Sequence, residues 1–257
     1  MRKIWLTISV ILAMASAVQA DMPQVVWMGG GARVSNEDRP GYTADTMISL
    51  GSYGGLTPFV SPMITVENSK VGTDIGLGAR MPVFGDQMIA GGNVFFDYTN
   101  DNNHRRVGLG AELFHPRFSG HVNAYLPLSD LHGHEEAVAG FDFNLGIPVP
   151  NAAFISIWPG FYYYNGHHED DMRGLSFAIT VRPIEVLSFT LGARNDTPAA
   201  GRDDHEIYGR IELTIPMSRL GKDLFSFQRG SYPREVNAQM ADRVVREQFI
   251  AIERYHP

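Results

Sequence analysis

The sequence predicts an all-β protein, a closed antiparallel transmembrane β-barrel of 12 strands. Stretches in which apolar and polar residues alternate follow one another from Val25 to Ile215, and successive residues of a strand point to opposite faces of the sheet. The connections between the stretches fall into two alternating classes. Most stretches are also long enough to cross a bilayer, which takes about 9–11 residues of tilted strand. One face of each strand is therefore expected to meet lipid and the other a polar lumen.

Each predicted strand is justified by its alternation. In 173–182 the odd positions are large and apolar, while the even positions are small, polar or cationic. The alternation is weakest in 25–34, where glycines follow one another, and in 56–66, which prolines interrupt. Proline cannot donate to the strand ladder and glycine has no side chain to pack, so both weaken a strand. The predicted strands are 25–34, 42–51, 56–66, 73–81, 88–98, 105–114, 117–127, 136–147, 152–164, 173–182, 186–194 and 206–215.

The connections distinguish the two rims of the predicted barrel. Those after even-numbered strands are short and contain proline, whereas those after odd-numbered strands are more polar and often longer. Bacterial outer-membrane barrels have this asymmetry, with short periplasmic turns, longer external loops and an even strand number. A soluble sandwich is the alternative, but it would cover its apolar faces with a second sheet and gives no reason for two different rims. The short class is 82–87, 115–116, 148–151 and 183–185, and the long class is 35–41, 99–104, 128–135, 165–172 and 195–205.

The start of the chain predicts export. Two cationic residues precede an apolar run that ends in Val18-Gln19-Ala20, as in a secretory signal peptide cleaved after a small residue. An uncleaved anchor is the alternative, but the run is shorter than the about 20 residues that a spanning helix needs. The expected location is the outer membrane of a Gram-negative bacterium. The expected parts are a cleaved signal peptide at 1–20, an outer-membrane barrel at 21–215 and a C-terminal tail at 216–257.

Composition disfavours several functions. The net charge of −7 argues against nucleic acid as a partner. The chain contains no cysteine, so disulfides do not stabilise it after export. The glycine run 29–31 does not open a predicted helix, which argues against a phosphate-binding loop, and no cofactor is expected. The expected partners are outer-membrane lipid, lipopolysaccharide, periplasmic chaperones and the barrel-assembly machinery.

Charged residues at inward positions predict a ladder of ion pairs inside the barrel, because the lumen of such barrels is polar. Ser119 and His121 also share one face of a strand. A nucleophile and its base need a third, orienting group, and no recognisable motif surrounds these two residues. We therefore expect no enzyme activity, with a lipid-modifying enzyme as an alternative. The ladder comprises Asp74, Arg80, Arg106, Glu112, Asp142, Arg182, Arg194, Arg210 and Glu212.

The long connections contain histidines and carboxylates, which are suitable ligands for divalent metals. In predicted external loops, the simpler interpretation is a hydrated surface that faces anionic lipopolysaccharide, with cations bridging loosely. No specific metal site is predicted. The loop residues are His132, His134, His167, His168, Asp170, Asp203 and Asp204.

Several segments resemble a known family, the inverse autotransporters, which include the intimin and invasin adhesins. NVFFDY (93–98) with HRRVGLGAE (104–112) looks like the family's signature hairpin, and NAYLPLS (123–129) looks like the strand after it. DRVVRE (242–247) is similar to the family's linker and contributes Arg243, Arg246 and Glu247. The segments similar to the closing strands are YYYNG (162–166), RG (173–174), RP (182–183) and GAR (192–194).

The resemblance implies an outer-membrane anchor or translocation unit whose linker passes back through the lumen to carry an extracellular passenger. Only about 42 residues follow Ile215, too few to build such a passenger. The implied function is surface display or host-cell attachment, with a role in virulence, and the implied partner is a host surface or a separate passenger chain. A small outer-membrane pore and a lipid-modifying enzyme are the alternatives.

The tail allows two interpretations. Apolar residues between 235 and 248 have roughly helical spacing, and an extended segment, 249–252, follows. The tail either stays in the periplasm with a short amphipathic helix, or enters the lumen and plugs it, which the resemblance favours. In the second case, tail arginines would pair with lumen acids. The arginines are Arg229, Arg234, Arg243 and Arg246, and the acids are Asp74, Glu112, Asp142 and Glu212.

Overall fold

Strands make up most of the structure, a computed structural model that describes residues 22–36, 40–67, 70–100, 102–131, 134–167, 170–196, 205–220, 224–225, 227 and 232–254. The predicted signal peptide lies outside the described residues. No helix among those described is long and apolar enough to cross a membrane. The elements are β1 (Gln24–Ser35), β2 (Gly41–Ser49), β3 (Thr57–Glu67), β4 (Lys70–Val83), β5 (Met88–Thr99), β6 (Arg105–His115), β7 (Phe118–Pro127), β8 (Glu135–Ala137), β9 (Ala139–Val149), β10 (Ala152–Asn165), β11 (Met172–Ile184), β12 (Leu187–Asp196), β13 (His205–Pro216), the 3-10 helices η1 (Met217–Arg219) and η2 (Asn237–Ala241), and β14 (Ile252–Arg254).

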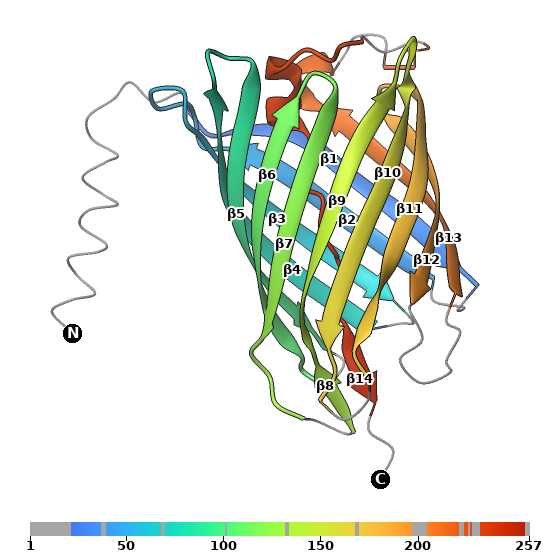
Figure 1. Ribbon diagram of the computed structural model, residues 1–257. Coiled ribbons are helices and arrows are strands. Elements are labelled where there is room, and N and C mark those ends of the chain that lie inside the picture. Colours follow the sequence, from blue (N-terminus) through green and yellow to red (C-terminus); the bar gives the residue numbers. More distant parts are fainter. Residues whose placement is uncertain are drawn as a thin grey trace, which may run out of the picture.

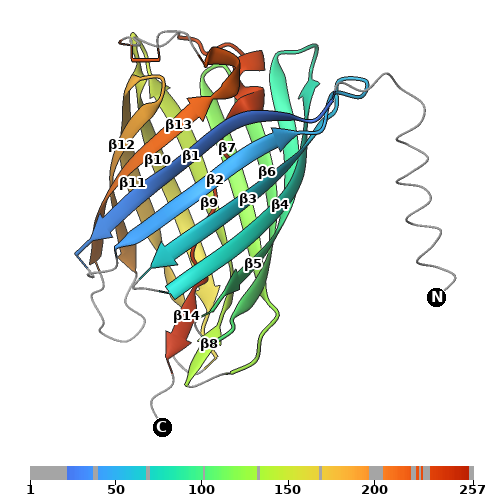
Figure 2. The same cartoon turned by 180° about the vertical axis from the view of Figure 1, so that it is seen from behind.

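Twelve of these strands close into an antiparallel barrel (Figure 1). Each barrel strand pairs with its neighbours along the chain, and β1 pairs with β13 from Trp27↔Pro216 to Ser35↔Tyr208, which closes the sheet (Figure 2). The remaining strands, β8 and β14, pair with each other at one end of the barrel. The predicted fold, a closed barrel of 12 strands, is confirmed.

The predicted alternation separates the two faces of the barrel wall. On β4, Ile75 and Leu77 are 53% and 54% exposed on the outer face, whereas Asp74 points into the lumen and is only 6% exposed. Large apolar side chains are exposed in the same way on other strands, including Leu191 on β12 and Leu175 on β11. In an outer-membrane barrel this surface meets lipid. Every barrel strand has a neighbour on both sides, as backbone in the hydrocarbon layer requires.

One predicted strand is interrupted in the structure, whereas the others differ from the observed strands only by a few residues at their ends. The stretch 136–147 is not continuous, because β8 ends at Ala137 and β9 begins at Ala139. The backbone N–H of Val138 between them donates to Ala251 O at 3.1 Å. β8 thus leaves the barrel wall and pairs with β14 of the tail. The alternation of apolar and polar residues continues through this break, so the sequence pattern did not indicate the break.

The tail runs from one rim of the barrel to the other through the lumen (Figures 1 and 2). It leaves β13 at the rim of the short turns, where η1 and η2 lie, and reaches β8 at the opposite rim. The amphipathic helix considered for 235–248 is wrong, since only 237–241 is helical, as a 3-10 turn. The backbone carbonyls of Asp242, Val245 and Glu247 accept hydrogen bonds from barrel side chains. Threading of the lumen by the tail is confirmed.

Candidate functional site: the tail in the lumen

The luminal tail, Met240–Ala251, is held by buried side chains that project inward from the barrel. Two barrel arginines each bond two tail carbonyls. Arg80 Nη1 donates to Met240 O at 2.7 Å and to Asp242 O at 2.6 Å. Arg106 donates to Phe249 O through Nη1 at 3.0 Å and to Glu247 O through Nη2 at 2.9 Å. These bonds fix the tail backbone near both ends of its passage.

Both of these arginines are themselves oriented by barrel carboxylates. Arg80 donates to Glu112 through Nε at 2.6 Å and through Nη2 at 3.1 Å. Arg106 Nε donates to Asp97 at 2.8 Å. A planar guanidinium can bond a carboxylate on one edge and offer its other N–H groups elsewhere. The pairs therefore hold the remaining donors of Arg80 and Arg106 toward the tail.

Two further side chains from the wall donate to tail carbonyls. Trp27 Nε1 donates to Ala241 O at 2.9 Å, and Asn123 Nδ2 donates to Val245 O at 2.9 Å. The side chain of Val244 packs on the buried cluster that contains Trp27. Backbone polar groups in a buried segment must find partners, and the wall supplies them to an otherwise irregular tail.

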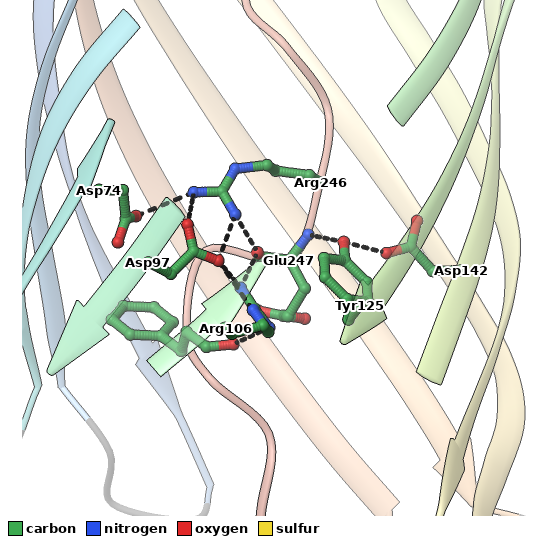
Figure 3. Close-up of polar contacts among 8 residues, drawn as sticks. Asp74, Asp97, Arg106, Tyr125, Asp142, Arg246 and Glu247 are labelled. Atoms are coloured by element: carbon green, nitrogen blue, oxygen red, sulfur yellow. Dashed lines mark hydrogen bonds and ion pairs between the residues drawn. The ribbon is translucent and has the colours of Figure 1, made fainter. Parts of the chain in front are cut away.

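Arg246 of the tail enters a buried group of charges on β4, β5 and β6 (Figure 3). Its Nη2 lies 2.9 Å from Asp74 Oδ2 and 2.9 Å from Asp97 Oδ1, and its guanidinium lies over the Phe95 ring. The strand register aligns Asp74 with Asp97, and Asp97 with Arg106. Two aspartates and two arginines therefore balance in charge, but one of the arginines comes from the tail.

Arg243 bridges two acids that lie on either side of β1. Its Nη1 is 2.7 Å from Glu212 Oε1 on β13, and its Nη2 is 3.0 Å from Asp45 Oδ1 on β2. Gly29 of β1 leaves the space for this, because a Cβ there would lie 2.3 Å from Arg243 Nη2. The glycine run that weakened the strand prediction thus makes room for the tail.

Glu247 is held by three groups of the wall, of which Figure 3 shows Arg106 and Tyr125. Its carboxylate pairs with Arg194 of β12, its carbonyl accepts from Arg106, and its N–H donates to Tyr125 Oη at 2.7 Å. Tyr125 in turn donates to Asp142. Side chains from β6, β7 and β12 therefore converge on a single tail residue.

The far end of the tail joins two of the long connections. β14 pairs with β8, and the N–H of His167 donates to both carboxylate oxygens of Glu253 at 3.1 and 3.0 Å. His167 Nδ1 also lies 3.1 Å from Glu136 Oε1. Ala251 packs on the cluster that contains Tyr125 and Val138. The tail is thus fixed at its exit as well as along the lumen.

The predicted pairs between tail and wall are present only in part. Arg243 meets Glu212 and Arg246 meets Asp74, as expected. Glu112 and Asp142 do not bind tail arginines, because Arg80 occupies the first and Tyr125 bonds the second, together with Asn123 and Asn144. Arg234 pairs with Asp242 inside the tail. Arg229 lies outside the described residues.

The other predicted residues are spread over the barrel. Arg210 lies 3.9 Å from Glu212, whereas Arg182 is exposed on β11. Of the predicted loop residues, His134, His167 and Asp170 are described, and His132, His168, Asp203 and Asp204 are not.

Sequence reasoning missed Asp97, Asp45 and Tyr125. Asp97 could have been found from its inward position in the alternation of β5, because Phe95 and Asp97 are buried while Val94 and Phe96 are exposed.

Ser119 and His121 do not form a nucleophile and base. Both face the lumen and are buried, and neither ring nitrogen of His121 has a hydrogen-bond partner among the described residues. His121 lies against Phe114 and Trp158 instead. An activated nucleophile needs a base within hydrogen-bonding distance, which this pair lacks.

Comparison with known proteins agrees with the barrel and its linker. The family model described as inverse autotransporter, beta-domain, matches residues 38–248. No curated protein matches the chain by sequence. A solved chain from a study of the in-meso crystallization of membrane proteins superposes with a TM-score of 0.77 at 17% identity, covering 90% of this chain and 99% of that one. A structure of KdgM porin superposes with a TM-score of 0.51 at 11% identity, covering 75% of this chain and 99% of that one. At such identities these structures show the fold alone.

Proposed function

Since the chain belongs to the inverse autotransporter β-domain family, we propose that this outer-membrane barrel anchors a polypeptide in its lumen for display on the cell surface. The observation that carries the proposal is the path of the tail, from the rim of the short turns to the rim of β8. In outer-membrane barrels the short turns are periplasmic. Chain that follows β14 would therefore emerge outside the cell, where it could attach to a host surface or hold a separate passenger chain.

The contacts of the luminal tail support a fixed anchor. Arg246 and its partners Asp74 and Asp97 are nearly inaccessible, with side-chain exposures of 3%, 3% and 0%. Breaking a buried pair by removing one partner costs about 3–5 kcal/mol. The carbonyl bonds from Arg80 and Arg106 add to this, since hydrogen bonds to charged groups contribute about 1.5–3 kcal/mol each. A tail with several such contacts resists withdrawal into the periplasm.

Export and assembly follow the same proposal. The chain would cross the inner membrane with a cleaved signal peptide at 1–20 and meet periplasmic chaperones and the barrel-assembly machinery. It would then insert among outer-membrane lipid and lipopolysaccharide.

An epitope placed at the C-terminus tests the proposal. An epitope fused after Pro257 should bind antibody on intact cells, and external protease should remove it. The same epitope inserted at Gly85, in the turn between β4 and β5, is the matched control and should become accessible only after the outer membrane is permeabilised. Labelling of the C-terminal epitope only in permeabilised cells would refute surface display.

The two alternatives have less support. A pore needs an open lumen, whereas the tail crosses this one. A lipid-modifying enzyme needs reactive groups that reach lipid, whereas Ser119 and His121 face the lumen. A large steady current from the intact protein in a planar bilayer would favour the pore. Hydrolysis of phospholipid that disappears on Ser119→Ala would favour the enzyme.

A further inference from the structure

The outer end of the tail gathers three metal-ligating side chains from three separate segments. Glu136 belongs to β8, His167 to the connection between β10 and β11, and Glu253 to β14 of the tail. One ligand atom from each lies within 4.8 Å of the other two. The three segments meet only because the tail has passed through the barrel.

The register of the small sheet brings two of these carboxylates together. Glu253 stands directly opposite Glu136 in the β8 and β14 pair. Like charges in directly opposite positions destabilise a sheet. Glu253 is buried, at 5% exposure, and both of its carboxylate oxygens accept from the N–H of His167. The backbone thus holds this carboxylate beside an imidazole and a second carboxylate, an arrangement that a cation would stabilise.

We propose that Glu136, His167 and Glu253 bind a divalent transition metal, with zinc as the representative ion. Zinc accepts one imidazole nitrogen and two carboxylate oxygens at about 2.0–2.2 Å and leaves a fourth position for water. Imidazole selects zinc, copper or nickel, whereas magnesium and calcium prefer an all-oxygen set.

The distances between the ligand atoms are compatible with this assignment. Ligand atoms of a tetrahedral zinc site lie roughly 3.4 Å apart, as follows from those bond lengths. His167 Nδ1 and Glu136 Oε1 are already 3.1 Å apart. The widest separation, within 4.8 Å, must shorten, and the His167 side chain that would move is 43% exposed.

The metal would join the tail to the barrel at its exit. Glu253 comes from the tail, while Glu136 and His167 come from the barrel connections. Zinc binding would therefore stabilise the pairing of β8 with β14 against fraying, whatever the protein displays.

Titration of the whole protein with zinc tests the proposal. The full chain, refolded in detergent micelles, is titrated with zinc chloride by calorimetry, and its resistance to thermal unfolding is followed by heat-modifiable gel migration. Wild type should bind one zinc ion. His167→Ala should weaken binding by at least about tenfold, in line with the 10–100-fold losses that follow removal of supporting groups at metal sites. Glu253→Gln should weaken it similarly, while its amide oxygen can still accept from the His167 N–H.

Two comparisons make the result decisive. His205→Ala removes another imidazole from the same rim and should leave the zinc affinity unchanged. All variants must show the wild-type gel shift on heating, which verifies that the barrel is closed. The proposal fails if wild type binds no zinc, if His167→Ala and His205→Ala behave alike, or if magnesium at the same concentration replaces zinc.

Discussion

Replacement of Arg246 by methionine should release the tail from the lumen. The variant keeps an apolar stem but removes the tail charge that faces Asp74 and Asp97 at 2.9 Å. Asp97 keeps Arg106 at 2.7 Å, so Asp74 is the carboxylate that loses its closest cation. The lower end of the cost of breaking a buried pair, about 3 kcal/mol, therefore applies. This corresponds to an increase of roughly a hundredfold in the equilibrium between displaced and seated tail.

Single-channel recording in planar bilayers measures this equilibrium, because displacement of the tail opens the lumen to ions. The open probability of Arg246→Met should rise about a hundredfold over wild type. Adding Asp74→Asn to Arg246→Met should return the open probability most of the way to the wild-type value. Replacing both partners of a buried pair by neutral groups often changes stability little.

An exposed pair provides the control for this experiment. Arg219 pairs with Glu185 at the rim, with its side chain 39% exposed, and exposed pairs contribute about 0–1 kcal/mol. If Arg246→Met opens no more often than Arg219→Ala, the tail is not held by its buried charges and the reasoning is wrong.

Three further changes test other parts of the structure. Gly29→Ala would place a Cβ 2.3 Å from Arg243 Nη2 and should cost about 1–3 kcal/mol by overpacking, seen as more frequent channel opening. Gly120→Ala, where nothing lies within 4 Å, should not differ from wild type, and equal effects would contradict this account of the glycine. Leu191 lies on the outer face and is 65% exposed. Leu191→Arg should lower the free energy of unfolding in lipid vesicles by about 2–4 kcal/mol, as measured by urea titration. Stability equal to wild type would place this face away from lipid. Deletion of 217–257 should give a steady current from a barrel that still shows heat-modifiable migration, and a silent deletion variant would show that the tail is not the plug.

The strands of the barrel were predictable because alternation is a property of local sequence. Inward and outward positions follow from a period of two, so the strands and most of the inward charges could be assigned before the structure was known. The break at Val138 could not, since it depends on a bond to Ala251 that lies far along the chain. Local alternation carries no information about a partner that arrives through the lumen.

The pairing of the tail with the wall was predictable only in outline. The predicted inward acids offered partners for the tail arginines, and two such pairs are present. Which acids remain available depends on the wall itself, because Arg80 already occupies Glu112. The position of the tail along the barrel axis is set by carbonyl bonds to Arg80 and Arg106, and no side-chain pattern in the tail encodes those bonds.

The hydrogen bonds from the wall to tail carbonyl groups affect how freely the amino-acid sequence of the tail can change. Arg80, Arg106, Asn123 and Trp27 bond atoms that all twenty amino acids possess. Substitutions at tail positions other than the charged ones leave these bonds intact, provided that the new side chain fits. The lumen therefore constrains the route of the polypeptide much more than its composition, and tails of quite different sequence can be accommodated by one and the same wall.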